Sequence, residues 1–367
     1  MINKVVFILS DSDDLHQTHR VHEFIEYGFD VDVYAFNRKD VPSKNMSHSF
    51  KINVIGEFYN SDSYQKRIPI IYKGIKYIAE KYNKRKEIVF FYQGLSVALS
   101  ATLMIKHPYI YEECDILQAS IKNKTLRKLL DRIDKKIISK SIKTIFTSGG
   151  FVDYYNYSEA PANVRLVTNR IQHSILELPY PHKKEINMGN LQLAFVGSMR
   201  YDSIYNFTKV FLVKFPNHDF HLFGGMSETK FHEFEKYPNF HNHGVFKNPN
   251  DLPAIYSQVD ILLCTYDNRD ENVLYAEPNK LYEAIYFKKP IIVSCNTYLE
   301  RKIKSMGIGY GVNPFDDDEI ISLISSLTEE CLLEKASNAN LINHDTCINN
   351  NEDFFRDLRC ALNNFII

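Results

Sequence analysis

A short stretch in the second half of the chain, AEPNKLYEA, combines residue types that suit a diphosphate. Pro278 is expected at the first position of a helix, because its missing N–H has no partner there. The free N–H groups of that first turn and the helix dipole then form an anion site, to which Lys280 adds a full positive charge. Glu283 shares a face with Lys280 and is placed to accept the hydroxyls of a ribose. The alternative is a capped helix with a Lys–Glu pair on its surface.

Two glycine motifs of the same half would let a phosphate or a sugar approach the backbone. In FVGSMRY, Gly197 ends an expected strand and offers bare backbone, and Arg200 can grip a diphosphate. In HGVFK, Gly244 and Val245 can present backbone groups to a base. Each motif fits an ordinary turn equally well.

Acids and histidines gather directly after the first expected strand, in SDSDDLHQTHRVH. A metal site there would use His16, His19, His22, Asp11, Asp13 and Asp14. A helix N-terminus attracts acids in any case, so we expect no metal. The loop is instead expected to line a cleft and meet an acceptor, with His19 as a candidate catalytic residue.

The composition is that of an ordinary globular protein. A length of 367 residues favours two domains, and 44% hydrophobic with 24% charged residues exclude collagen-like and largely disordered chains. No C-x-x-C pair occurs among the scattered cysteines, so neither a disulfide framework nor a zinc site is expected. No apolar run approaches the roughly 20 residues of a transmembrane helix. The N-terminus lacks a signal-peptide cleavage site, so we expect a cytoplasmic protein.

Positive charge is concentrated in the first half of the chain. Residues 1–180 hold 26 Lys and Arg against 20 Asp and Glu, which leaves 18 bases against 25 acids in the rest. The excess lies in 66–86 and 122–143, and the second segment also has apolar residues at helical spacing. A basic amphipathic helix suits an anionic membrane surface, so we expect a peripheral protein on the inner face of the cytoplasmic membrane. The alternative is a helix that packs on the core and exposes its bases; nucleic acid is not an expected partner.

Both halves of the chain alternate strand-like with helix-like runs. The strands expected in the first half are VVFILS (5–10), FDVDVYAF (29–36), KINVIG (51–56), EIVFFY (87–92), PYIYEE (108–113), TIFTS (144–148) and NVRLVTN (163–169). Those expected in the second half are LQLAFVG (191–197), FHLFG (220–224), FHNHG (240–244), VDILLCTY (259–266), PIIVS (290–294) and GIGYGV (307–312). The expected helices include 18–27, 63–84, 94–106, 318–330 and 352–366. Such alternation predicts parallel sheets covered on both faces.

We therefore predict two α/β domains with a cleft between them, where ligands of such folds usually bind. The proline-rich polar residues 178–190 are expected to link the two domains.

The order of the motifs in the second half resembles the donor-binding domain of glycosyltransferases with two Rossmann-like domains, the GT-B architecture. It is similar to the family 4 enzymes of bacterial capsule and O-antigen assembly. A strand ends in G-x-x-R, a second ends in FGG, and HGV, VDILLCTY, EPNKLYEA and KKPIIVS follow in that order. The first half resembles the acceptor domains more loosely, because YEECDI (111–116) is similar to a Y-E-x-H-D motif.

The resemblance implies a role for each motif. Arg200 and Lys280 would hold the diphosphate of a nucleotide sugar, Glu283 the ribose and Val245 the base. The implied donor-binding set is Gly197, Arg200, Gly224, Gly244, Val245, Glu277, Pro278, Asn279, Lys280, Leu281 and Glu283. On the acceptor side, Glu112 and Asp115 match the acids of the motif and are the candidates for a general base.

The chain departs from the family pattern at three points. Tyr275 stands eight residues before Glu283, where the family has a glutamate. Cys114 replaces the histidine of the acceptor motif, and SDSDDLHQTH replaces a glycine-rich loop after the first strand.

The resemblance also implies the domain plan. It assigns 1–178 to an acceptor-binding domain and 191–350 to a donor-binding domain, both Rossmann-like. Residues 351–367 would form a helix that crosses back to the first domain through Phe354, Phe355, Leu358 and Leu362.

The function expected from these observations is sugar transfer from a nucleotide diphosphate sugar to a saccharide or polyprenyl-diphosphate-linked acceptor in surface-polysaccharide assembly, and a lipid-linked saccharide is favoured. No cofactor or metal is needed, because Arg200 and Lys280 stabilise the leaving diphosphate. The resemblance favours retention of configuration over inversion. The alternatives are a nucleotide-sugar 2-epimerase of the same fold and a non-catalytic partner protein.

Overall fold

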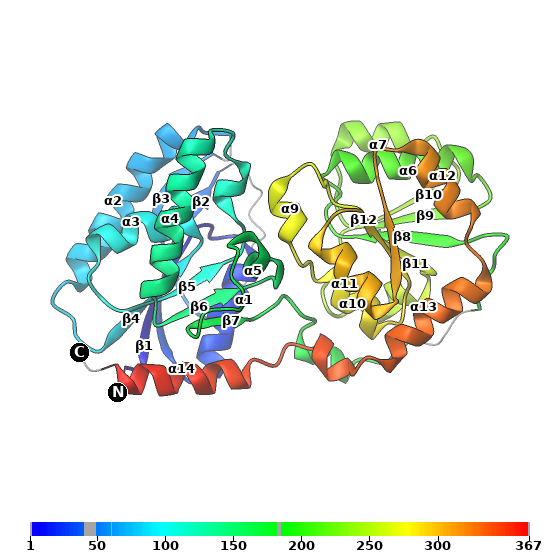
Figure 1. Cartoon of the computed structure of the whole chain (residues 1–367). Coiled ribbons are helices and arrows are strands. Elements are labelled where there is room, and N and C mark those ends of the chain that lie inside the picture. The colour runs from blue at the N-terminus through cyan, green and yellow to red at the C-terminus, as the bar shows by residue number, and fades with distance from the viewer. Residues whose placement is uncertain (1, 40–48, 60, 182–184, 366–367) are drawn as a thin grey trace. The chain divides into compact units, whose positions relative to one another are not determined.

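The computed structural model describes residues 2–39, 49–59, 61–181 and 185–365 of the chain. They form two compact units, of which the first combines Met1–Thr168 with Asn351–Ile367 and the second is Asn169–Asn350. Each unit is a parallel sheet with helices on its faces (Figure 1). The prediction of an α/β protein with two Rossmann-like domains is confirmed.

The first unit is built on a seven-stranded sheet in the order β3-β2-β1-β4-β5-β6-β7, with all neighbours parallel. Its strands are β1 (Lys4–Leu9), β2 (Asp30–Arg38), β3 (Ile52–Phe58), β4 (Ile88–Gln93), β5 (Tyr109–Glu113), β6 (Lys143–Phe146) and β7 (Val164–Leu166). Every residue of β4 and β5 is buried, as expected of central parallel strands covered on both faces. All seven stretches that the sequence predicted as strands form strands.

Helices cover both faces of this sheet. They are α1 (Leu15–Glu26), α2 (Tyr64–Tyr82), α3 (Leu95–Met104), the 3-10 turn η1 (Leu117–Ser120), α4 (Lys124–Lys140), α5 (Gly150–Tyr154) and α14 (Glu352–Asn364). The rings of Phe90 and Tyr82 of α2 lie 5.8 Å apart, whereas the adjacent Phe91 lies 5.4 Å from Phe24 of α1. Because side chains alternate along a strand, α1 and α2 cover opposite faces. Helices α2, α3 and α4 contact one another in sequence and form one layer.

The last helix packs on the first unit. Phe354, Phe355, Leu358 and Leu362 are buried in the same apolar cluster as residues of β1, β4 and α1. The ring of Phe355 stacks on Tyr27 with centroids 4.0 Å apart. Figure 1 shows α14 in red against the blue N-terminal elements.

The second unit is built on a six-stranded parallel sheet in the order β10-β9-β8-β11-β12-β13. Its strands are β8 (Gln192–Val196), β9 (Asp219–Phe223), β10 (Phe240–Gly244), β11 (Ile261–Cys264), β12 (Ile291–Ser294) and β13 (Gly309–Val312). Its helices are η2 (His173–Glu177), α6 (Asp202–Lys214), α7 (Glu228–Phe234), α8 (Leu252–Ser257), α9 (Glu271–Tyr275), α10 (Lys280–Tyr286), α11 (Tyr298–Met306), α12 (Asp317–Ser325), α13 (Glu329–Leu341) and η3 (His344–Cys347). The six expected strands are all present.

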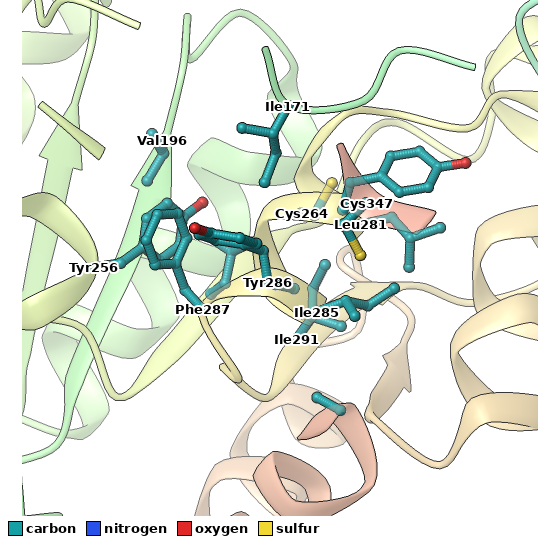
Figure 2. Packing of buried hydrophobic residues seen from close by; sticks show 14 of the residues in the cluster. Ile171, Val196, Tyr256, Cys264, Leu281, Ile285, Tyr286, Phe287, Ile291 and Cys347 are labelled. Carbon is teal, nitrogen blue, oxygen red and sulfur yellow. The ribbon is translucent and has the colours of Figure 1, made fainter. Parts of the chain in front are cut away.

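One apolar core cluster of this unit contains residues from the beginning of the unit, from its end and from α10, the helix at the EPNK motif. Tyr256 and Phe287 stack with ring centroids 4.4 Å apart (Figure 2). Ile171 and Cys347 are buried in the same cluster. Ile171 N–H donates to the Cys347 carbonyl at 2.9 Å, so the two ends of the unit lie together.

The structure differs from the expectations at three places. The helix expected from Thr18 begins at Leu15, because the Asp14 side chain caps it by accepting Gln17 N–H at 3.0 Å. The single helix expected over 318–330 is two, because Thr328 caps a new one and accepts Cys331 N–H.

The third difference concerns the boundary between the domains. Residues 169–178, which we expected in the first domain, group with the second unit because Ile171 and Ile175 are buried in its core. Of the expected linker 178–190, residues 182–184 lie outside the described residues.

Candidate functional site

In each unit the predicted residues gather where the strands of a parallel sheet end. The strand order reverses between β1 and β4 in the first unit and between β8 and β11 in the second. Ligands of open α/β sheets bind outside the carboxyl ends of the strands at such a reversal. The two sites are described separately below.

Three glycines end three neighbouring strands of the second unit. Gly197, Gly224 and Gly244 follow or end β8, β9 and β10 with φ of +138°, +142° and +72°. Gly197 N–H donates to Phe223 O and Gly224 N–H to Gly244 O, both at 2.7 Å. A Cβ on Gly224 would lie 1.9 Å from the carbonyl oxygen of Gly197, so only glycine fits there. The result is an edge of bare backbone that a phosphate or a sugar can approach closely.

Lys280 reaches the same edge from α10. A Cβ on Gly197 would lie 3.9 Å from Cε of Lys280, which places this side chain beside the glycine. The Lys280 ammonium donates to both carboxylate oxygens of Glu283, at 2.8 and 3.0 Å. The alternative considered for this pair was a surface contact, but both side chains are buried.

Glu283 is held from three directions. Besides Lys280, it accepts from Tyr256 Oη at 2.5 Å and from Asn279 Nδ2 at 3.0 Å. A carboxylate oriented in this way can exchange one of these donors for a ligand hydroxyl. Glu277 is buried nearby in the chain and accepts from Lys302 Nζ at 2.5 Å and from Tyr282 Oη.

Two details of the EPNK motif differ from the expectation. Helix α10 begins at Lys280 and has seven residues, so Pro278 precedes the helix instead of starting it. The Pro278 carbonyl accepts Leu281 N–H at 3.1 Å, which uses one of the N–H groups expected to face an anion. The Leu281 side chain is buried in the apolar core of the unit (Figure 2).

Arg200 and Val245 are exposed, as donor-contacting residues would be. Val245 is 89% exposed directly after the glycine of β10. The Arg200 guanidinium lies over the Tyr201 ring, 5.1 Å from its centroid, and donates to Tyr201 Oη at 3.2 Å. The ring holds the guanidinium by a cation–π contact at the protein surface.

A buried charge network occupies the carboxyl edge of the first sheet. Glu112, at the end of β5, is fully buried and accepts from Arg20 Nε at 3.1 Å and Nη2 at 2.9 Å. Arg20 also contacts Glu23 on its own helix. His16 Nε2 lies 3.2 Å from Glu112 Oε1, and the His16 side chain is 26% exposed.

The charges of this network control two pKa values. Burial alone would raise the pKa of Glu112, but the charges and hydrogen bonds of Arg20 and His16 outweigh it and lower the pKa to about 2. Burial lowers the pKa of His16, but the carboxylate of Glu112 outweighs this and raises it. Glu112 is therefore ionised and shielded, and His16 is the titratable group that solvent or a substrate can reach.

His19, which the sequence favoured as the catalytic histidine, lies away from Glu112. It is next to Glu23, 3.7 Å from its carboxylate, and burial lowers its pKa. The helix starts three residues earlier than expected, so positions 16 and 20 face β5 and position 19 does not. Asp115 is exposed beyond the end of β5.

The acids and histidines after β1 do not converge on a metal site. Asp14 caps α1, Asp11 pairs with Arg38 at 3.3 Å, and His22 contacts Ser49 and Phe50. A different group, His16, Glu112 and Cys114, has ligand atoms within 4.8 Å of one another. We do not assign them as metal ligands, because the Arg20 guanidinium already bonds the carboxylate and its charge opposes a cation.

Solved structures share this architecture over the whole chain. Sucrose-phosphate synthase from Thermosynechococcus elongatus has a TM-score of 0.69 at 13% identity, covering 98% of both chains. HepE from Anabaena, solved in complex with UDP and glucose, has a TM-score of 0.67 at 12% identity and covers 98% of this chain and 100% of its own. The chain has the GT-B fold.

The GT-B fold includes isomerases as well as transferases among the similar structures. UDP-GlcNAc 2-epimerase from Neisseria meningitidis, bound to UDP-GlcNAc, has a TM-score of 0.59 at 12% identity and covers 91% of this chain and 94% of its own. No family model matches the chain, and no curated protein matches its sequence.

Proposed function

We propose that the protein is a glycosyltransferase that moves a sugar from a nucleotide diphosphate sugar to a hydroxyl of a saccharide acceptor. The observation that carries this proposal is the bare glycine edge of the second sheet, with Lys280 beside Gly197. Transfer needs stabilisation of the diphosphate as it leaves, and the ammonium of Lys280, beside backbone that carries no side chain, would supply positive charge without a metal. In the similar structures, HepE was solved with UDP and glucose.

Lys280 and Glu283 are the centre of the proposed donor site. In the free protein they neutralise each other, which keeps both charges buried at tolerable cost. We propose that the ribose hydroxyls bind Glu283 and that the ammonium of Lys280 turns toward the diphosphate. The exposed Arg200 would exchange its contact with Tyr201 for the second phosphate, and the exposed Val245 would contact the base.

On the acceptor side we propose His16 as the group that binds the acceptor hydroxyl. Glu112 is fully buried, and its pKa of about 2 makes it a weak base. It serves instead to orient the His16 ring, as a carboxylate does for many catalytic histidines. Asp115, exposed two residues after Glu113, is the remaining acid of the motif and would contact the acceptor.

The anomeric configuration of the product tests the role of His16. The resemblance favours retention, in which the leaving diphosphate takes the acceptor proton and His16 only holds the acceptor. An inverted product would assign His16 as the base that takes this proton. The ¹H NMR coupling of the new anomeric proton separates the two outcomes.

A lipid-linked acceptor, in capsule or O-antigen assembly, fits the layer formed by α2, α3 and α4. Among the described residues no helix is long and apolar enough to cross a membrane. The layer nevertheless exposes large apolar side chains among its lysines: Ile68, Tyr72, Tyr77, Leu103, Leu126 and Leu129. A groove of about 560 Å³ between α2 and β3 adds Lys51, Lys73 and Lys81. We propose that this layer lies on the anionic inner face of the cytoplasmic membrane.

The first experiment is a thermal unfolding series with UDP, GDP, ADP, CMP and their sugars. A ligand at 100 times its dissociation constant adds about 2.7 kcal/mol of stability. We expect one nucleoside diphosphate to raise the melting temperature, and Glu283→Gln and Arg200→Ala to reduce that shift. Lys214→Ala, an exposed change in the last turn of α6, is the matched control. No shift with any nucleotide would refute the proposal.

An epimerase is the second candidate, because an epimerase shares the fold. An epimerase would convert the donor sugar with no acceptor present, whereas a transferase releases the nucleotide only when an acceptor is supplied. Incubation of the identified donor alone, followed by chromatography of the sugar, distinguishes the two.

A further inference from the structure

Two carboxyl side chains meet inside the first unit, away from Glu112. Glu113 on β5 and Asp134 on α4 are both fully buried, and the Tyr155 hydroxyl contacts both carboxyl groups. Among the described residues, no lysine, arginine or histidine forms an ion pair with either one. Two buried negative charges side by side without a cation would be very unfavourable.

Neutral donors surround the pair from three segments. Tyr111 Oη donates to Glu113 Oε2 at 2.6 Å, and Gln118 Nε2 of η1 donates to Asp134 Oδ2 at 2.9 Å. Tyr155, next after α5, contacts Asp134 Oδ2 and lies 3.2 Å from Glu113 Oε2. These contacts serve one oxygen of each carboxyl group.

The other two oxygens show where a proton is needed. Glu113 Oε1 and Asp134 Oδ1 are buried and have no hydrogen-bond partner in the described residues. If both groups are ionised, neither oxygen can donate to the other. One proton on Glu113 turns this carboxyl group into a donor and removes one of the two buried negative charges, while the Tyr155 hydroxyl links the two groups.

We propose that Glu113 and Asp134 share one proton and that this pair positions the end of β5, and through it Glu112 and His16. The inference rests on the proposed function for its catalytic consequence. Side chains alternate along a strand, so Glu113 faces α4 while Glu112 faces α1. A change in the pair therefore moves the backbone that carries Glu112. Glu113 and Asp134 are positioning residues and do not touch substrate.

The groups around Glu113 and Asp134 determine whether the pair gains or loses its proton as the pH changes. Burial, then the charge of Asp134, raise the pKa of Glu113 well above its usual range. Burial raises the pKa of Asp134, although hydrogen bonds from Tyr155 and Gln118 offset part of this. The titratable groups that face the pair are Tyr111, Tyr155 and Tyr157, and burial raises the pKa of each. Among these groups the pair itself is therefore the first to lose a proton as the pH rises.

The free energy of unfolding should fall with rising pH as the folded pair loses its proton. In the unfolded chain these carboxyls ionise near their usual pKa, whereas the folded pair keeps its proton to higher pH. The stabilisation is complete below the unfolded pKa and is lost as the pH rises through the folded pKa. In that window the folding constant falls about tenfold for each pH unit for one bound proton.

Infrared spectroscopy of the full chain tests the proton directly, without reference to activity. At pH 7 we expect a protonated-carboxyl band in the wild type that is lost in Glu113→Gln. Asp131→Asn is the matched control, because Asp131 lies on the same helix as Asp134 and accepts a hydrogen bond from Tyr154 Oη at 2.8 Å, away from the pair. This control should keep the band. No such band in the wild type, or the same band in Glu113→Gln, would overturn the shared proton.

The pH profile of transfer tests the positioning role. In the wild type kcat/KM should fall on the alkaline side, and Glu113→Gln, which stays neutral, should lose this fall and keep the acidic limb of His16. Asp134→Asn should give the same pH profile as Glu113→Gln, and Asp131→Asn should give the profile of the wild type. A Glu113→Gln profile identical to the wild type would overturn the positioning role. An infrared band with no transfer to any acceptor would instead refute the proposed function and leave the shared proton standing.

Discussion

Glu112 and Glu113 are consecutive residues of β5, both fully buried, and their surroundings displace their pKa values in opposite directions. The side chain of Glu112 meets an arginine and a histidine on one face of the sheet and stays ionised. The side chain of Glu113 meets an aspartate and two tyrosines on the other face and keeps a proton. The difference arises entirely from what each face of the strand packs against.

Loss of Arg20 should expose the cost of burying Glu112. We expect Arg20→Gln to lower the free energy of unfolding at neutral pH by about 3–5 kcal/mol, because it leaves a buried charge unpaired. The pKa of Glu112 is lowered to about 2 from 4.5, so this stability is present above about pH 4.5 and is lost as the pH falls toward 2. Urea titrations at neutral and acid pH measure both effects.

The control for this experiment is Lys76→Gln on α2, which removes only an exposed contact with Glu80. Its expected cost is below about 1 kcal/mol. An Arg20→Gln variant as stable as Lys76→Gln would show that Arg20 does not compensate Glu112.

Gly224 and Gly225 offer a matched pair of substitutions at the donor edge. Gly224→Ala places a Cβ 1.9 Å from Gly197 O at a φ of +142°, whereas a Cβ on Gly225 meets nothing within 4 Å. We expect Gly224→Ala to cost about 1–3 kcal/mol from strain alone, and more from the clash, and to abolish nucleotide binding. Gly225→Ala should change stability by about 0.5 kcal/mol or less. Calorimetric titration with the identified nucleotide measures binding. Equal affinity in the two variants would show that the nucleotide does not bind at the glycine edge of the second sheet.

Leu126 and Leu129 should carry part of the membrane affinity. They are 46% and 52% exposed on α4 among basic residues. We expect the double change Leu126→Asp and Leu129→Asp to weaken binding to phosphatidylglycerol vesicles by about tenfold or more, since each buried leucine contributes about 1.5–3 kcal/mol. Leu166→Asp on β7, where the leucine is 49% exposed, is the control and should not change sedimentation with vesicles. Equal losses in both variants would argue against docking through α4.

Transfer should not depend on a divalent cation. In the proposed donor site Lys280 and Arg200 would supply the positive charge at the leaving diphosphate, so kcat should be unchanged after dialysis against EDTA. A loss of activity that Zn²⁺ or Mg²⁺ restores would refute this and direct attention to His16, Glu112 and Cys114.

Phe355 should hold the last helix on the first unit. Its side chain is 1% exposed and stacks on Tyr27, so Phe355→Ala should cost about 3–5 kcal/mol. Arg356→Ala on the same helix removes only an exposed contact with Asp353 and should be nearly neutral. Hydrogen exchange of the helix amides would show the loosening directly, and unchanged protection in Phe355→Ala would contradict it.

The strands were predictable because parallel strands are short apolar runs bounded by turn residues. VVFILS and EIVFFY each fill a buried strand, and no other arrangement hides so many apolar side chains in so few residues. Helix limits were less predictable. Thr328 could have been recognised as a cap that ends one helix and begins another, whereas the position of Pro278 before α10 depends on the turn closed by Leu281 N–H.

The candidate site was predictable only where the contacts are local. Lys280 and Glu283 are three residues apart, so their pairing could be expected, although not their burial. The contact between Arg20 and Glu112 joins residues 92 apart, and nothing in the spacing of either segment indicates it. For the same reason the sequence pointed to His19 and missed His16, whose partner Glu112 is known only once the sheet order β1-β4-β5 brings the end of β5 to α1.

Folding of the second unit lowers the entropy cost of docking the last helix, α14, on the first unit. Residues 169–350, or 182 residues, separate β7 from the last helix, yet Ile171 N–H reaches Cys347 O at 2.9 Å. When the second unit is folded, its two ends are held together. The chain between β7 and α14 then behaves as a loop of only a few residues when α14 docks on the first unit. Unfolding the unit would lengthen that loop by about five doublings and add about 3 kcal/mol to the cost of docking. A nucleotide that stabilises the second unit thus also secures the last helix, through the length of the free chain alone.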